Sequence, residues 1–227
     1  MRAKGNRLTL IPASSEGATV DLPGAGACAA ETRFALLAGD SWMRLPAPIR
    51  RRFSRHLAHG ERIVYLGEVA ATHMTLVGRL LAQLARLVGA PLPLEASCCV
   101  PVTVIVTGSE RFGGQIWTRI YDRMRGFPQV IQSVKHFGGA TGLEEIVAHG
   151  VGMQLRLSVR DGALVFQSAG YFIRCLGVQL SLPNWLTPGV IVVGHREESG
   201  GQFSFSLSVT HIWAGHVIDQ IAFFREE

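Results

Sequence analysis

The 227-residue chain has the composition of a folded globular protein, because 48% of its residues are hydrophobic and 17% are charged. That composition excludes an intrinsically disordered chain, and the length suits one domain with a substantial core. The formal net charge of +5 comes partly from a basic run between Ile49 and Arg62. A solvated helix face or a contact with nucleic acid or an anionic membrane would explain this run. No interleaving of aromatic and basic residues supports nucleic acid, so no nucleic-acid partner is predicted.

The cysteines and the apolar runs indicate where the chain resides. Its four cysteines, Cys28, Cys98, Cys99 and Cys175, form no C-x-x-C pair, so we expect free thiols in a reducing compartment. No uncharged apolar run is long enough to span a bilayer, and the N-terminal residues lack the apolar core of a signal peptide. We therefore expect a cytoplasmic protein without a transmembrane segment.

Residues 1–30 are rich in Gly, Ala, Ser and Pro and show no sustained hydrophobic period. They are predicted to form a flexible N-terminal tail, and residues 31–227 a single domain. This domain is predicted to begin with a short helix that has Thr32 as its N-cap and ends at Gly39.

A second helix is predicted around Pro48, which suits a first helical turn. Ile49, Phe53 and Leu57 fall at i, i+4 and i+8, and this spacing predicts a narrow apolar stripe. The arginines of this helix are expected to lie elsewhere around it: Arg51, Arg52 and Arg55.

A third helix is predicted from Met74 to Val88. Its apolar row consists of four leucines, Leu76, Leu80, Leu84 and Leu87, and its polar face carries Arg79, Gln83 and Arg86. The favoured interpretation is a helix that packs its apolar row on a sheet. The alternative is an amphipathic helix that lies at a membrane surface.

The rest of the chain has the patterns of strands, separated by Gly, Pro and Asp-Gly turns. These segments include Arg62 to Ala70, Cys98 to Thr107, three short segments between Gly113 and Gly150, Gly152 to Val159, Val190 to Arg196, Phe203 to His211 and Gly215 to Phe224. Helices followed by roughly eight to ten strands predict an α+β fold. We expect a large curved antiparallel sheet or partly open β-barrel with two or three N-terminal helices packed on it.

Asp161-Gly162 predicts a tight hairpin. Beyond it, Leu164, Phe166 and Phe172 are expected on one face of the next strand, because side chains in a strand alternate.

Several signatures of catalysis and cofactor binding are absent from the sequence, namely the G-x-S-x-G, Walker A and H-E-x-x-H motifs. Gly24-Ala25-Gly26 has neither a preceding strand nor a third glycine at the spacing of a nicotinamide site. No cofactor and no metal are predicted.

The candidate site residues are polar or aromatic side chains that alternation places on apolar faces. Arg119 lies between two aromatics and Glu145 between two aliphatic residues. Burial of an unpaired charge costs several kcal/mol (about 3–5), so each charge must have a partner or line a wet cavity. Either the two residues brace the sheet as an ion pair, or they line a pocket in which Arg119 holds an acidic head group. The full candidate set is Trp117, Arg119, Tyr121, Glu145, His195 and His211.

Several short motifs also match one family pattern: W-x-x-L-P at Trp42 to Pro46, Trp117-x-Arg119, Phe127 to Ser133, Gly142 to Glu145, Leu182-Pro183, Phe203-x-Phe205 and His211 to Gly215. On these motifs, from Phe34 to the C-terminus, the chain resembles a bacterial domain-of-unknown-function family, number 4166. Members often follow saccharopine-dehydrogenase-like or short-chain-dehydrogenase-like NAD domains. The resemblance therefore implies a self-contained module and a separately encoded NAD-dependent oxidoreductase as partner, but it supplies no catalytic residues.

Three functions remain open. The first is a module that binds a hydrophobic or amphipathic small molecule and acts with an oxidoreductase. The second is a structural domain that docks on such a partner through the basic helix. The third is an isomerase or hydrolase that uses Glu145 and His211, which requires those side chains to approach each other.

Overall fold

The computed structural model describes residues 33–87, 89, 92, 98–111, 113–123, 126–147 and 150–227. The predicted tail at residues 1–30, with Cys28, lies outside these residues. The described cysteines are free thiols, as predicted. The chain begins with helical elements: residues 33–38 form a helix that continues as the 3-10 helix η1 (Gly39–Arg44), and α2 (Ala47–Ser54) follows. The third helix, α3 (Leu76–Leu87), comes between the first two strands. No described helix combines the length and the apolar character needed to cross a bilayer.

The strands are longer and more numerous than the patterns predict. They are β1 (Arg62–Met74), β2 (Val100–Ser109), β3 (Gly114–Tyr121), β4 (Gln129–His136), β5 (Glu144–Ile146), β6 (Val151–Arg160), β7 (Ala163–Cys175), β8 (Val178–Leu182), β9 (Val190–Glu197), β10 (Phe203–His211) and β11 (Gly215–Glu226). Two single-turn 3-10 helices, η3 (Asn184–Leu186) and η4 (Ser199–Gly201), lie in the connections.

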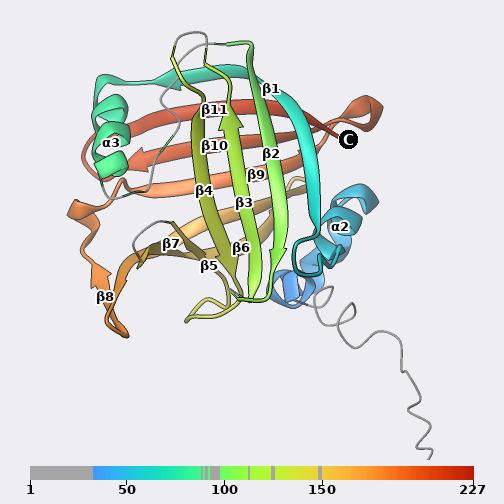
Figure 1. Cartoon of the computed structure of the whole chain (residues 1–227), viewed down its shortest axis with the longest axis horizontal. Helices are drawn as coiled ribbons and strands as arrows, with labels where there is room; N and C mark the ends of the chain where they lie inside the picture. The colour runs from blue at the N-terminus through green and yellow to red at the C-terminus, as the bar shows by residue number, and fades with distance from the viewer. Residues whose placement is uncertain are drawn as a thin grey trace, which may run out of the picture.

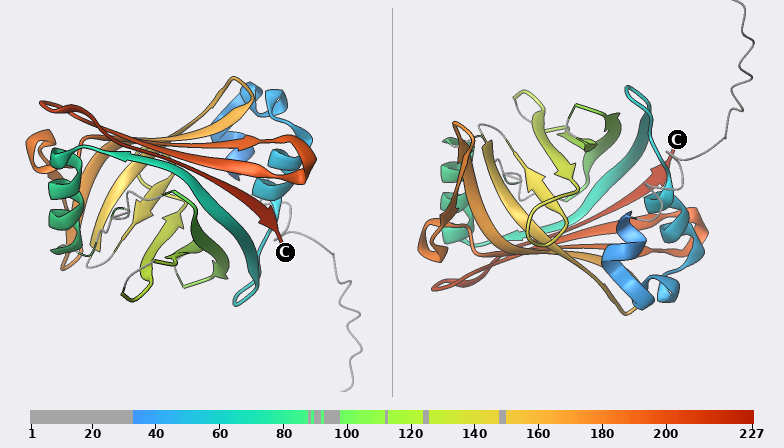
Figure 2. Two further views of the ribbon diagram at one scale, coloured as in Figure 1. Left: turned by 90° about the horizontal axis from the view of Figure 1, so that it is seen from above. Right: turned by 90° about the horizontal axis from the view of Figure 1, so that it is seen from below.

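The strands form one antiparallel sheet with the order β6-β5-β4-β3-β2-β1-β11-β10-β9-β7-β8, and an additional pairing joins β6 to β7. This pairing closes ten of the eleven strands into a barrel and leaves β8 outside it, attached to β7 (Figure 1). The predicted α+β class with a large antiparallel sheet is confirmed. The two ends of the barrel are visible in Figure 2, with α2 at one end and α3 at the other.

The Asp161-Gly162 hairpin is confirmed, since both residues have positive φ angles, 48° and 72°, and connect Arg160 to its partner Ala163. Two positive φ angles are the requirement of the type I′ turn that matches the twist of paired strands. The predicted shared face of Leu164, Phe166 and Phe172 is wrong. The register between β6 and β7 shifts beside Ser168, because a bulge there adds one residue to β7. Side chains beyond a bulge exchange faces, so Phe172 lies on the face opposite Phe166.

The barrel core is aromatic at the end that α2 covers. Phe53 of α2 inserts its ring beside Trp117 and Phe166, with ring centroids 6.4 and 5.7 Å away. Ile49 of α2 is also fully buried. The predicted apolar stripe of this helix is therefore correct for Ile49 and Phe53, and Leu57 lies beyond the end of the helix. Below α2 the inward-facing phenylalanines of β10 and β11 continue the core.

Helix α3 corrects the favoured interpretation of its leucine row. The row faces away from the barrel: Leu76 is 82% exposed and Leu87 is 81% exposed. The helix packs through its two buried small residues, Gly78 and Ala82. A Cβ on Gly78 would lie 2.3 Å from the carbonyl oxygen of Val217, so only glycine permits this approach to β11.

Candidate functional site

Alternation along β3, β4 and β5 brings a cluster of charges together inside the barrel. Glu145 Oε2 accepts a hydrogen bond from Lys135 Nζ at 2.7 Å, and Glu145 Oε1 accepts one from Ser133 Oγ at 2.6 Å. Arg119 donates to Ser133 Oγ at 3.2 Å and to Glu145 Oε1 at 3.4 Å. Arg119 and Glu145 thus form an ion pair, as expected if the two residues brace the sheet.

The electrostatics of this cluster hold Glu145 ionised. Burial alone would raise the pKa of Glu145. The charges of Lys135 and Arg119, with the hydrogen bonds from Lys135 and Ser133, outweigh burial and bring the pKa to about 2. Burial lowers the pKa of Lys135, and Arg119 adds to that effect while Glu145 opposes it. We regard the ionised carboxylate between two cations as the dominant state, because each oxygen of Glu145 accepts a short hydrogen bond.

Only part of this charge cluster is accessible to solvent. The Arg119 side chain is 23% exposed, whereas that of Glu145 is almost fully enclosed. Trp117 and Tyr121, predicted as pocket walls, are buried in the core on either side of Arg119. Trp117 donates its indole N–H to Gln115, and Tyr121 donates its hydroxyl to Gln220. Glu145 and its partners brace the sheet, and Arg119 is the member of the cluster that retains access.

His195 belongs to a different group, at the α2 end of the barrel. Its Nε2 lies 2.9 Å from Arg52, which also donates to Glu197 at 3.2 Å. The Arg52 guanidinium stacks 3.9 Å from the centroid of Phe203. Burial, and secondly the charge of Arg52, holds the pKa of His195 well below its usual value. Since arginine can only donate, the neutral ring accepts at Nε2 and carries its hydrogen on Nδ1. Arg52 is therefore a buried anchor and not part of a solvated helix face.

His211 lies at the end of β10 and organises the turn to β11. Its Nδ1 accepts from the backbone N–H groups of Trp213 and Ala214, both at 3.4 Å. No hydrogen bond joins His211 to Glu145 among the described residues. The structure therefore places the two residues of the predicted acid–base pair in separate hydrogen-bond groups.

Sequence reasoning missed Lys135 and Ser133 because the pattern of β4 is misleading. On this strand the inward face carries Ile131, Ser133 and Lys135, while the outward face carries Val130 and Val134. Lysine side chains are mostly exposed, so the sequence of β4 alone would place Lys135 on the outward face. Only its pairing with Glu145 on the neighbouring strand β5 identifies it as an interior residue.

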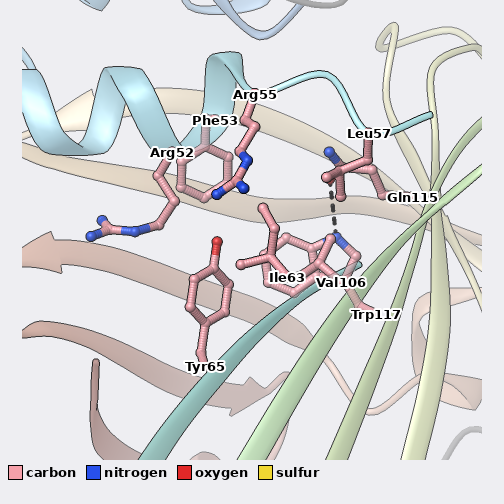
Figure 3. A pocket seen from close by; sticks show the side chains of 9 residues that line it. All are labelled: Arg52, Phe53, Arg55, Leu57, Ile63, Tyr65, Val106, Gln115 and Trp117. Atoms are coloured by element: carbon pink, nitrogen blue, oxygen red, sulfur yellow. Dashed lines mark hydrogen bonds between the residues drawn. The ribbon is translucent and has the colours of Figure 1, made fainter. Parts of the chain in front are cut away.

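A groove with a volume of about 670 Å³ lies between α2 and the barrel mouth and adjoins several charged side chains. That volume lies within the range of about 300–1,000 Å³ common for ligand sites. A second, inner space reaches Trp117 but holds only about 10 Å³, enough for roughly one water molecule. Figure 3 shows the side chains that line this inner space, where the Tyr65 hydroxyl points toward α2.

The wall of this groove, which we call the mouth groove, is strongly basic. Arg55 pairs with Glu226 at 2.6 Å, and Arg52 pairs with Glu197. Arg50 and Arg51 have no carboxylate partner among the described residues, and Arg50 donates only to the sulfur of Met43. Burial, and secondly Glu226, raises the pKa of Tyr65 to about 12, so its hydroxyl stays a donor. The residues that line the groove are Trp42, Ala47, Pro48, Arg50, Arg51, Arg52, Ser54, Arg55, His56, Ile63, Tyr65 and Glu226.

This arrangement suits an anion more than a metal ion. Arginine donors and one tyrosine hydroxyl surround the groove, and guanidinium groups match the geometry of carboxylates and phosphates. Among the described residues no three His, Cys, Asp or Glu side chains come together as they would around a metal.

Comparison with known proteins places the chain in a family but supplies no activity. No curated protein and no solved structure shows significant similarity to it. A family profile matches residues 45–224, which include α2, the barrel strands as far as residue 224 of β11, and the arginines of the mouth groove. The chain therefore belongs to the family described as Domain of unknown function (DUF4166).

Proposed function

We propose that this protein is a binding module for a small amphipathic anion, held in the mouth groove at the α2 end of the barrel. The observation that carries the proposal is the presence of four arginines around a groove of about 670 Å³ with a single lining carboxylate. Mouths of β-barrels are common positions for ligand sites.

The charge of the groove supports an anionic head group. Arg55 and Arg52 are committed to carboxylates, but Arg50 and Arg51 of the same helix turn have none among the described residues. A phosphate or carboxylate near them would gain charge-assisted hydrogen bonds, each contributing about 1.5–3 kcal/mol.

The floor of the groove supports an apolar portion in the same ligand. Trp42, Ile63 and Tyr65 line the same groove as the arginines, together with Ala47 and Pro48. The inner space beyond Phe53 is too small for a chain of carbon atoms. The ligand is therefore expected to lie along the groove, with its apolar part against Trp42.

Calorimetric titration with dodecyl phosphate below its micellar concentration tests this proposal. Dodecanol and inorganic phosphate serve as the isolated apolar and anionic halves, and both should bind more weakly than dodecyl phosphate. The double charge reversal Arg50→Glu/Arg51→Glu should weaken binding by about tenfold or more, because tenfold corresponds to about 1.4 kcal/mol.

The control is Arg160→Glu, which reverses one exposed charge on a residue that does not line the groove. It should leave the affinity unchanged. Equal affinities of wild type and the Arg50→Glu/Arg51→Glu variant, or equal affinities for dodecanol and dodecyl phosphate, would contradict the proposal.

None of the six residues predicted from strand alternation lines the mouth groove. A ligand contact of Arg119, the partly exposed member of its cluster, stays a prediction, as does an NAD-dependent oxidoreductase as partner. The Arg50→Glu/Arg51→Glu variant distinguishes a ligand site at Arg119 from a ligand site in the mouth groove. A ligand at Arg119 would bind the Arg50→Glu/Arg51→Glu variant normally and would lose affinity in an Arg119→Gln variant.

A further inference from the structure

The α3 end of the barrel carries an apolar surface that no other described part of the chain covers. The leucine row of α3 points outward, and beside this helix the turn between β10 and β11 exposes Ile212 and Trp213, the latter by 73%. We call this the α3 end face and define it by six residues: Leu76, Leu80, Leu84, Leu87, Ile212 and Trp213.

The helix and the turn are held on the same strand. Thr75 donates its backbone N–H to the carbonyl of Val217 at 3.0 Å, and Gly78 packs against that carbonyl one helical turn later. Val217 follows the Trp213 turn by four positions in β11. Figures 1 and 2 show α3 and the β10–β11 turn at one end of the molecule in all three views. The α3 end face is therefore a fixed surface built on a strand of the barrel.

Positive charge flanks the apolar side chains. A helix turns 100° per residue, so Leu76, Leu80 and Leu87 lie opposite the buried pair Gly78 and Ala82. By the same geometry, Arg79 and Arg86 lie together along one side of the leucine row. The helix contains no acidic residue. On β11, the carboxylate of Asp219 is already paired with His216.

We propose that the α3 end face docks on the surface of a bilayer that contains anionic phospholipids. Helix α3 would lie parallel to the membrane plane, with its leucines below the head groups and Arg79 and Arg86 at the level of the phosphates. Trp213 would occupy the interfacial zone that tryptophan prefers. This inference uses none of the residues of the mouth groove and does not depend on the proposed function.

Charge and shape favour a bilayer over a protein partner. The apolar side chains stand on two projections, a helix and a hairpin turn, and a fluid surface adapts to such projections. Both charged residues of the helix are positive and stand beside the leucines, the arrangement of helices that lie on anionic membranes. A second copy of this chain, with its α3 packed antiparallel across a two-fold axis, would bring arginine against arginine.

Vesicle flotation with the full-length protein tests the inference. Vesicles of phosphatidylcholine alone are compared with vesicles of equal parts phosphatidylcholine and phosphatidylglycerol. The protein should float with the anionic vesicles, and the emission of Trp213 should shift to shorter wavelength, a change absent in Trp213→Phe. Leu80→Glu/Leu87→Glu should reduce binding at least about tenfold, because each buried leucine contributes about 1.5–3 kcal/mol.

Two further variants identify the source of binding. Arg79→Glu/Arg86→Glu should remove the preference for anionic vesicles, and the groove variant Arg50→Glu/Arg51→Glu should float like the wild type. All of these substitutions fall on exposed or partly exposed positions, and far-ultraviolet circular dichroism confirms that each variant is folded.

Absence of flotation with anionic vesicles would overturn the inference. So would flotation that the leucine variant leaves unchanged. If sedimentation instead shows a dimer that Leu80→Glu/Leu87→Glu converts to a monomer, and no vesicle binds, the face is an interface between copies of the chain and the membrane proposal is wrong.

Discussion

Helices α2 and α3 cap opposite ends of one barrel, and both depart from their sequence patterns: α2 buries an arginine beside its predicted apolar stripe, and α3 exposes its apolar row. Helix α2 directs Arg52 inward onto Phe203, His195 and Glu197. Helix α3 directs its leucines outward and contacts the barrel through Gly78 and Ala82.

The difference between α2 and α3 shows what determines which face of a helix is buried. Hydrophobic periodicity predicts that a helix exists, but the burial of a charge depends on partners that come from distant strands. At α3 the decisive factor is the close backbone approach that Gly78 permits. Neither factor is visible within the helix sequence itself.

The largest expected effect is at Arg52. Arg52→Ala removes two hydrogen bonds and a stacked cation and leaves Glu197, 16% exposed, without its partner. Because one partner of a nearly buried pair is lost, the free energy of unfolding in urea should fall by about 3 kcal/mol. Arg51→Ala, one residue away and exposed, is the matched control and should change stability by less than about 0.5 kcal/mol. Equal effects of the two substitutions would show that Arg52 is not the anchor of α2.

A smaller effect is expected at α3. Gly78→Leu places a side chain against the Val217 carbonyl and should lower the free energy of unfolding by about 2 kcal/mol through overpacking. Leu80→Gln, on the exposed side, should cost less than about 0.5 kcal/mol. The measurement is again urea unfolding. A larger loss for Leu80→Gln than for Gly78→Leu would mean that the leucine row, not the glycine, packs on the barrel.

The smallest effect is the pH dependence of the α2 end. His195 is neutral in the folded protein because burial, and then Arg52, lowers its pKa well below 6.5, whereas the unfolded chain takes up a proton near that value. Stability is therefore lost as pH falls below about 6.5, by at most about 1.4 kcal/mol per pH unit. His195→Gln should flatten this slope between pH 6.5 and 5, and the exposed control His59→Gln should retain it.

Glu145 affects stability in a separate, more acidic pH range. The stability that comes from its lowered pKa is lost only as pH falls from 4.5 toward about 2.

Much of the fold could be predicted because its strands carry local signals. The alternation of Phe203, Phe205, Leu207 and Val209 with serines predicts β10 as it is observed, and Asp161-Gly162 predicts the hairpin. Strands β5 and β8 are too short to show a period. The bulge beside Ser168 could not be predicted, because one inserted residue reverses the faces without any signature in the side chains.

The candidate sites were predictable in part. Alternation correctly places Arg119 and Glu145 on inward faces, and the structure joins them in one cluster. It could not show that Lys135 satisfies the second oxygen of Glu145, because cross-strand register determines that contact. The mouth groove depends on where α2 sits across β1 and β11, which no local pattern specifies.

The pairing of β1 with β11 has a consequence for how the chain folds. Tyr65 is opposite Glu226, so the first barrel strand finds one of its two neighbours only in the last. Until β11 has been synthesised, one edge of β1 lacks its hydrogen-bonding partner strand, and β11 does not yet cover the aromatic side chains of β10. Closure joins segments far apart in sequence, and such long-range pairing makes folding slow. A ribosome-bound chain that ends before β11 is therefore expected to expose this edge and to need protection from aggregation.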